Sequence, residues 1–167
     1  MKNKTKRVAF LGLLTSVALV LSYIEAILPP IWAAIPGIKM GFPNIVIIFL
    51  LYRFGVKEAA IVSVIRLFIV ALLFGNVMTL AYSFAGAVLS LLLMALCKWS
   101  DKLSVVGTSI VGGVAHNLGQ ILVAIFLFDT VQIGYYMAVL AVTGTIAGVF
   151  IGLAGALLLK RLEKYRV

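Results

Sequence analysis

Residues 8–28 read VAFLGLLTSVALVLSYIEAIL, and Glu25 is the only charged side chain among them. A helix needs about 20 mostly apolar residues to cross the hydrocarbon core of a bilayer, so this run predicts a membrane span. Pro29 and Pro30 end the span, because proline cannot continue a helix. The basic start resembles a signal peptide, but the apolar stretch is too long and no small-residue cleavage site leads into a soluble domain.

Comparable apolar runs recur along the rest of the chain. We expect further spans over residues 42–54, 57–74, 77–99, 103–128 and 131–159. The last is longer than a membrane requires, so we expect it to be tilted or to begin near Tyr135 and Tyr136. Three prolines and a glycine break the apolar segment 29–41, which we expect to form an outer loop. The sequence therefore predicts an all-α integral membrane protein, with six transmembrane helices in one domain over residues 1–167.

The composition excludes most other classes of protein. Hydrophobic residues make up 64% of the 167 residues and charged residues 11%, with a mean hydropathy of +1.23. In a typical soluble domain about 45–50% of the residues are hydrophobic and about 25% are charged. A soluble enzyme, a disordered chain and a secreted disulfide scaffold are thereby excluded. Cys97 is the only cysteine, so it forms no internal disulfide and no cysteine zinc site.

The net charge of +9 comes from short basic clusters that flank the apolar runs. This pattern follows the positive-inside rule for cytoplasmic loops and does not indicate a nucleic-acid surface. With six spans and a cytoplasmic N-terminus, Lys39 lies outside and Arg66 lies within a span. The other basic residues lie in the cytoplasm: Lys2, Lys4, Lys6, Arg7, Arg53, Lys57, Lys98, Lys102, Lys160, Arg161, Lys164 and Arg166. We therefore expect a multi-pass protein of the cell membrane with both termini in the cytoplasm.

Arg66 lies near the middle of the third expected span. A central arginine costs about 2.5–3.5 kcal/mol on insertion scales, so it normally faces a cavity or a partner. Two interpretations remain open. Arg66 belongs to a structural ion pair or snorkels to the interface, with Glu58 as a neighbour about two turns away, or it anchors an anionic ligand.

Other polar side chains share helical faces inside the expected spans. The fourth span carries a row of small or polar residues at intervals of three and four, bordered by Tyr82. In the fifth span His116 is either a hydrogen-bonded structural group or a ligand contact, and no second histidine is present to complete a metal site. Most of these groups fall in the half that we expect to face outside. The predicted substrate-binding residues are Lys39, Asn44, Arg66, Asn76, Thr79, Tyr82, Ser83, His116, Asn117 and Gln120.

Small residues indicate where helices pack closely in a membrane. The sixth span carries Gly144, Gly148 and Gly152 at intervals of four, which favours packing within the protein. The first span carries Ala9, Gly12 and Ser16 on one face. This second face either packs internally or docks another membrane protein.

Sequence motifs for independent catalysis are absent. The chain has no GxxxxGK[ST] phosphate-binding sequence, no DDxxD sequence and no evident pair of nucleophile and base, so we expect no enzyme, no metal and no cofactor. Six helices without a recognisable inverted repeat are also few for a complete secondary transporter. A binding subunit that needs a partner accounts for both observations.

Two longer stretches carry a family resemblance: PGIKMGFPNIVIIFLLYRFGVKEAAIVSVIRLFIVALLFG over residues 36–75 and GGVAHNLGQ over residues 112–120. Together with the basic start and the proline-rich loop, they resemble the substrate-binding S components of energy-coupling factor (ECF) transporters. Within these, the chain is most similar to the Gx group, often labelled heptaprenyl diphosphate synthase component I. The resemblance covers essentially the whole chain.

The resemblance implies a six-helix fold that captures a small compound, such as a vitamin or precursor, at the outer face. It implies partners as well: one transmembrane coupling subunit and two cytoplasmic ATPase subunits. The first helix would dock through Ala9, Gly12 and Ser16, and the loop 29–41 would form part of a lid. The synthase label suggests an isoprenoid or quinone precursor as ligand, and Arg66, Lys39 and His116 suit an anionic head group. The alternative function is a membrane component associated with heptaprenyl diphosphate, and hence prenyl quinone, synthesis.

Overall fold

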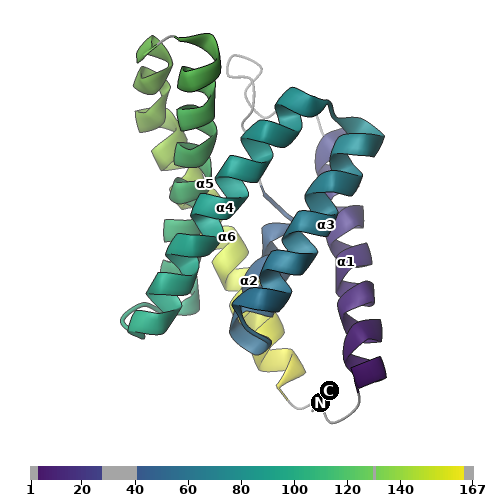
Figure 1. Cartoon of the computed structure of the whole chain (residues 1–167). Coiled ribbons are helices and arrows are strands. Elements are labelled where there is room, and N and C mark those ends of the chain that lie inside the picture. Colours follow the sequence, from purple (N-terminus) through teal and green to yellow (C-terminus); the bar gives the residue numbers. More distant parts are fainter. Residues whose placement is uncertain (1–3, 28–40, 130, 164–167) are drawn as a thin grey trace.

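A computed structural model describes residues 4–27, 41–129 and 131–163, and these form helices without any strand (Figure 1). In order, the elements are α1 (Lys4–Ile27), α2 (Asn44–Arg53), α3 (Val56–Phe74), α4 (Val77–Ser100), α5 (Val105–Phe128), the 3-10 helix η1 (Val131–Tyr136) and α6 (Met137–Leu162). The predicted all-α class is confirmed, and α6 begins directly after Tyr136, as expected for the overlong last run.

Four of the described helices are long and apolar enough to cross a membrane, which indicates a multi-pass membrane protein. They are α1, α4, α5 and the continuous helical segment Gly134–Leu162. The prediction of six spans is thus supported in part. The second expected span contains only the ten residues of α2. A helix of that length rises about 15 Å, which is half of the apolar thickness of a bilayer. The third, α3, has 19 residues but carries Lys57, Glu58 and Arg66.

Short polar or glycine residues set the helix boundaries. Asn76 caps α4, because its Oδ1 accepts a hydrogen bond of 2.8 Å from the backbone N–H of Thr79. Ser104 caps α5 in the same way, with its Oγ 3.2 Å from the backbone N of Gly107. Such side chains satisfy N–H groups that a helix leaves free at its first turn. Between α2 and α3 the chain turns at Gly55, whose φ of +121° favours glycine. These local signals fix where the long helices begin and turn back.

The long helices form two groups, α1 with α3 and α4 with α5 and α6, and α2 lies between them (Figure 1). In the second group α5 packs along both α4 and α6. The contact with α6 is close: a Cβ atom added at Gly148 would lie 2.6 Å from the Cα of Ile110, and one added at Gly152 would lie 2.7 Å from the Cα of Val106. The predicted glycine row of the last span is therefore a packing face inside the protein.

The short helix α2 lies at the centre and joins the two groups. Its residues from Val46 to Leu51 are all at most 3% exposed, and Ile48 packs against α6 at Gly155. At the C-terminal end of α2, Tyr52 and Thr108 share a hydrogen bond of 2.8 Å between their hydroxyl groups. Lys98 donates a hydrogen bond of 2.6 Å to the carbonyl of Leu51. These bonds link α2 to α4 and α5 at the end predicted to face the cytoplasm.

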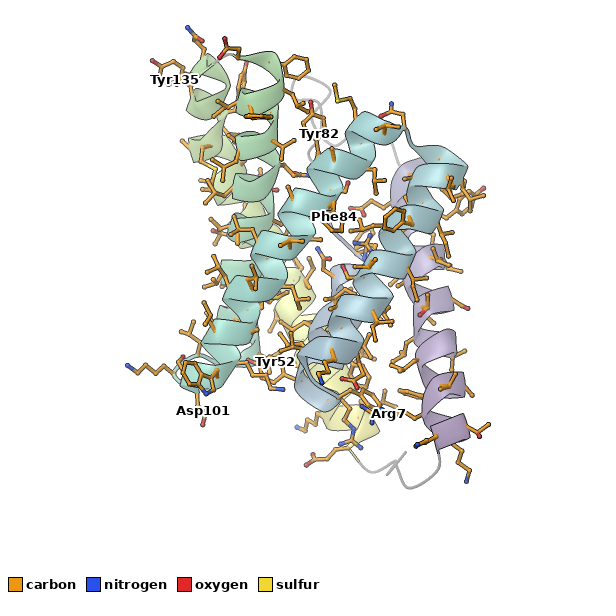
Figure 2. All side chains as sticks on the ribbon, viewed as in Figure 1. Arg7, Tyr52, Tyr82, Phe84, Asp101 and Tyr135 are labelled. Atoms are coloured by element: carbon orange, nitrogen blue, oxygen red, sulfur yellow. The ribbon has the colours of Figure 1, made fainter. Side chains whose placement is uncertain are left out.

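Helix α1 is the least buried of the long helices. It packs mainly against α3, and near its start Arg7 forms an ion pair with Glu58 at the beginning of α3. Figure 2 shows Arg7 at the same end of the molecule as Tyr52. Glu58, which the sequence suggested as a neighbour of Arg66, therefore pairs with a different arginine.

Candidate functional site

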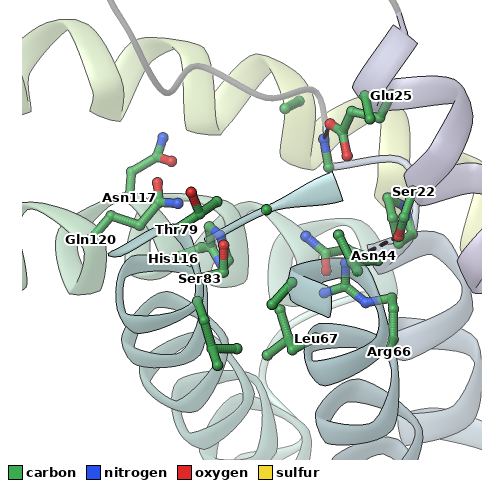
Figure 3. Close-up of a pocket in the computed structure, with 18 of the residues that line it drawn as sticks. Ser22, Glu25, Asn44, Arg66, Leu67, Thr79, Ser83, His116, Asn117 and Gln120 are labelled. Atoms are coloured by element: carbon green, nitrogen blue, oxygen red, sulfur yellow. Dashed lines mark hydrogen bonds between the residues drawn. The ribbon is translucent and has the colours of Figure 1, made fainter. Parts of the chain in front are cut away.

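A cavity of about 110 Å³ lies between the two groups of helices, and all six α-helices contribute to its wall (Figure 3). It includes residues from the last turns of α1 and α3 and the first turns of α4. These ends belong to the half that the charge distribution predicts to face outside.

The cavity brings together seven of the ten side chains that the sequence selects for substrate binding. These are Asn44, Arg66, Thr79, Ser83, His116, Asn117 and Gln120. Asn76 and Tyr82 do not line it, and Lys39 lies outside the described residues. Asn76 has another task, because its side-chain oxygen accepts hydrogen bonds from both the backbone and the hydroxyl of Thr79. Whether the seven residues bind a ligand stays a prediction.

Arg66 dominates one wall of the cavity. Arg66 is only 8% exposed. Its Nη1 donates a hydrogen bond of 3.3 Å to Ser22 Oγ. Its Nε is buried without a hydrogen-bond partner in the described part of the chain. Glu25, on the same face of α1 as Ser22, attracts the guanidinium electrostatically. Glu25 also accepts a hydrogen bond from the backbone N–H of Gly41.

The Glu25–Arg66 attraction bears on both interpretations of the arginine. It lowers the cost of burying a cation, since a nearby opposite charge compensates part of the lost hydration. Arg66 still has N–H groups that can donate to a ligand, because a guanidinium has five N–H donors. The arginine is thus held by α1 and still lines the cavity.

Ser22 and Glu25 line the cavity but are not among the substrate-binding residues that the sequence predicts. Both lie in the first apolar run, three residues apart, and such a spacing places two side chains on one helical face. This polar pair at the end of an otherwise apolar helix is the sequence feature that could have identified both residues as part of the site. Its partner on α3 is a tertiary contact, which periodicity along one helix does not reveal.

The opposite wall is built by α4 and α5. Thr79 and Ser83 are one turn apart on α4, and His116, Asn117 and Gln120 come from the middle of α5. Asn117 donates a hydrogen bond of 2.7 Å from Nδ2 to the carbonyl of Leu140 on α6. Gly144 makes room for this amide, because an added Cβ there would lie 2.8 Å from Asn117 Nδ2. The glycine row of α6 therefore also shapes the cavity.

Several polar groups of the lining have no hydrogen-bond partner among the described residues. Apart from Arg66 Nε, these are the side chains of Asn44, Ser83 and Gln120, which form no hydrogen bond with any described residue. Unpaired amides and hydroxyls at a cavity offer both donors and acceptors to water or to a small molecule. In the described part of the chain, no three His, Cys, Asp or Glu side chains are placed to hold a metal ion. The described lining thus offers hydrogen-bonding groups around the oppositely charged side chains of Arg66 and Glu25.

The family model described as heptaprenyl diphosphate synthase component I matches residues 14–158, most of the chain. The chain belongs to this family. The region shared with the heptaprenyl diphosphate synthase component I family contains every cavity-lining residue, from Ser22 to Ile151. No curated protein and no solved structure matches the chain.

The small face of α1 begins before the part of the chain that the family model matches, since Ala9 and Gly12 precede residue 14. A Cβ atom added at Gly12 would meet nothing within 4 Å. Ala9 and Ser16 are exposed, and the Ser16 hydroxyl donates to the carbonyl of Gly12 at 3.1 Å. The described residues thus leave this face uncovered, and docking of another protein on it stays a prediction.

Proposed function

We propose that this chain is the membrane-embedded substrate-binding subunit of an ECF-type uptake transporter, and that it captures a small compound at the outer face of the cell membrane. The cavity is the observation that carries this proposal. Polar side chains from several helices converge there, in a protein whose other helical surfaces are mainly apolar. A concave site with a few convergent polar groups is the usual form of a small-molecule binding site.

The proposed orientation has six membrane-crossing segments, with both termini in the cytoplasm. Helix α3 has 19 residues, which is close to the length that a span requires. The second crossing is the expected span over residues 42–54, which contains α2. In Figure 1 the beginning of α1 and the end of α6 lie at the same end of the molecule. The cavity then opens toward the outside, and the Tyr52–Thr108 contact lies on the cytoplasmic side of it.

The proposed partners are a transmembrane coupling subunit and two cytoplasmic ATPase subunits. The chain has no ATP-binding motif of its own, so import against a gradient needs an external source of energy. The uncovered face of α1 at Ala9, Gly12 and Ser16 supports docking of the coupling subunit. Small residues let two helix backbones approach closely in lipid.

Assembly with the partner tests this proposal. Gly12→Leu fills the uncovered face, so we expect it to reduce co-purification with the co-expressed coupling subunit at least about tenfold while the isolated variant stays as stable as the wild type. Val17→Leu is the matched control, because Val17 is exposed on another side of the same helix. Equal loss of assembly in both variants, or loss of folding in Gly12→Leu, would contradict docking through this face.

The family description favours one alternative function, a membrane component associated with heptaprenyl diphosphate and prenyl quinone synthesis. The two functions differ in what the purified protein does with isoprenoid precursors. Formation of prenyl chains by the purified protein, alone or with a synthase subunit whose activity it raises, would favour the alternative. Retention of a reproducible small compound, identified by mass spectrometry, would favour the binding subunit.

A further inference from the structure

The polar groups of the cavity are separated into two sets that face each other. Figure 3 shows Arg66 with Ser22, Glu25 and Asn44 on one side, and the polar residues of α4 and α5 on the other. The first set contains a cation. The second set is uncharged apart from the imidazole of His116, and it includes Ser83 and Gln120, whose side chains form no hydrogen bond with any described residue.

The charge of the first set limits the charge of the occupant. Arg66 is the only lysine or arginine among the described residues that line the cavity, and Glu25 already offsets part of its charge. A diphosphate carries several negative charges and is normally held by several cationic groups or by Mg²⁺ with carboxylate ligands. One partly compensated guanidinium matches one anionic group, such as a carboxylate.

The size and polarity of the cavity limit the body of the occupant. Its volume of about 110 Å³ is well below the roughly 300–1,000 Å³ of pockets that bury drug-sized ligands. A long prenyl chain would extend beyond this volume. The wall that faces Arg66 is also polar, whereas a hydrocarbon chain would leave the amide of Gln120 desolvated and unpaired, which is unfavourable.

We infer that the occupant is a small, water-soluble monoanion, whose anionic group pairs with Arg66 and whose opposite, uncharged end hydrogen bonds with Gln120 and Ser83. This inference rests on the proposed function, and it names the class of compound that the site takes up. It separates the chain's ligand from prenyl diphosphates, although the family description refers to one of them. It also assigns different tasks to the two walls, namely charge recognition on α3 and recognition of polar shape on α4 and α5.

The inference can be tested with defined probes on the full chain in lipid nanodiscs. The probes are monocarboxylates that end in a primary amide, with one to four methylene groups between the two ends. Matched compounds lack either the amide or the carboxylate, and farnesyl diphosphate with Mg²⁺ represents the prenyl class. We expect at least one amide-terminated carboxylate to bind with a Kd below about 10 mM, more tightly than both of its matched compounds and than farnesyl diphosphate.

Three variants separate the two walls. Arg66→Met should weaken the best probe at least about tenfold, since a hydrogen bond to a charged group is lost. Gln120→Ala should weaken it about three- to tenfold and remove the advantage over the amide-free carboxylate. Lys57→Met removes a positive charge from the same helix outside the cavity and should leave affinity unchanged. If Arg66→Met fails to fold, comparing the amide-terminated and amide-free probes on Gln120→Ala still tests whether the uncharged end of the ligand binds at Gln120.

The outcomes distinguish this inference from the proposed function. Tightest binding of farnesyl diphosphate, no binding of any amide-terminated carboxylate at about 10 mM, or equal affinity in wild type and Gln120→Ala would overturn the ligand class, even if the chain assembles with its coupling subunit. Binding as expected without such assembly would support the ligand class and count against the transporter role.

Discussion

The contact between α5 and α6 allows a quantitative prediction at Gly148. Replacement by alanine places a Cβ 2.6 Å from the Cα of Ile110 and 2.9 Å from the carbonyl oxygen of Ser109. Ordinary contacts begin at 3.4 Å, so the helices must separate locally to accept the methyl group. Both clashing atoms belong to the backbone and no side-chain rotation relieves them. Overpacking of this kind costs about 1–3 kcal/mol.

Gly12→Ala is the matched control for this change. Alanine is favoured over glycine in a helix by up to about 1 kcal/mol, and this gain applies to both positions. At Gly12 the added methyl group meets nothing within 4 Å, so the gain is not offset. The difference in the free energy of unfolding between the two variants therefore isolates the clash, and we expect Gly148→Ala to be less stable by about 1–3 kcal/mol.

Unfolding of both variants by denaturing detergent, from mild detergent micelles and followed by circular dichroism, measures this difference. Equal stability of Gly148→Ala and Gly12→Ala would refute the reasoning, because it would mean that α5 and α6 are not in backbone contact at this point. An unstable Gly12→Ala would instead show that the face of α1 is covered in the isolated protein.

Two further predictions concern topology and the hydrogen bond between Tyr52 and Thr108. Reporter fusions at Val167 and near Asp129 should report opposite sides of the membrane, because the basic clusters favour cytoplasmic termini; the same side for both would exclude the six-span orientation. Tyr52→Phe should lower the free energy of unfolding by about 1–3 kcal/mol, since it leaves the fully buried hydroxyl of Thr108 without this partner. The double variant Tyr52→Phe with Thr108→Val should recover part of that loss in the same unfolding assay. No recovery would show that the hydrogen bond between Tyr52 and Thr108 does not account for the lost stability.

The sequence was sufficient for features that depend on one helix at a time. The long apolar runs predicted α1, α4, α5 and α6 because burial in lipid requires length and apolarity, and both are visible in the chain. An interval of four residues placed Thr79 with Ser83 and His116 with Gln120, since such residues share a helical face. The structure brings both pairs to one cavity.

Features that depend on contacts between helices were not predictable in the same way. The attraction between Glu25 and Arg66 joins residues on different helices that are far apart in the sequence, and nothing in either helix alone specifies it. Asn76 fits the polar row of α4 but caps the helix, because a side chain just before a helix competes for its free backbone N–H groups. The shortness of α2 was predictable, by contrast, because the expected span over residues 42–54 is already shorter than a membrane crossing requires.

The ten residues of α2 rise only about 15 Å, and Asn44 at the start of this helix lines the cavity. When water fills a cavity that reaches Asn44, the low-dielectric layer beneath it is about half as thick as the surrounding bilayer. A transmembrane voltage then falls mainly across this thin layer, where moving one elementary charge is worth about 2.3 kcal/mol per 100 mV. In the proposed orientation, a charged solute that enters from outside and stops above α2 would cross little of that voltage. Under the proposed function, its capture would therefore be nearly independent of the membrane potential, and the electrical work would fall to the later step that moves it past α2.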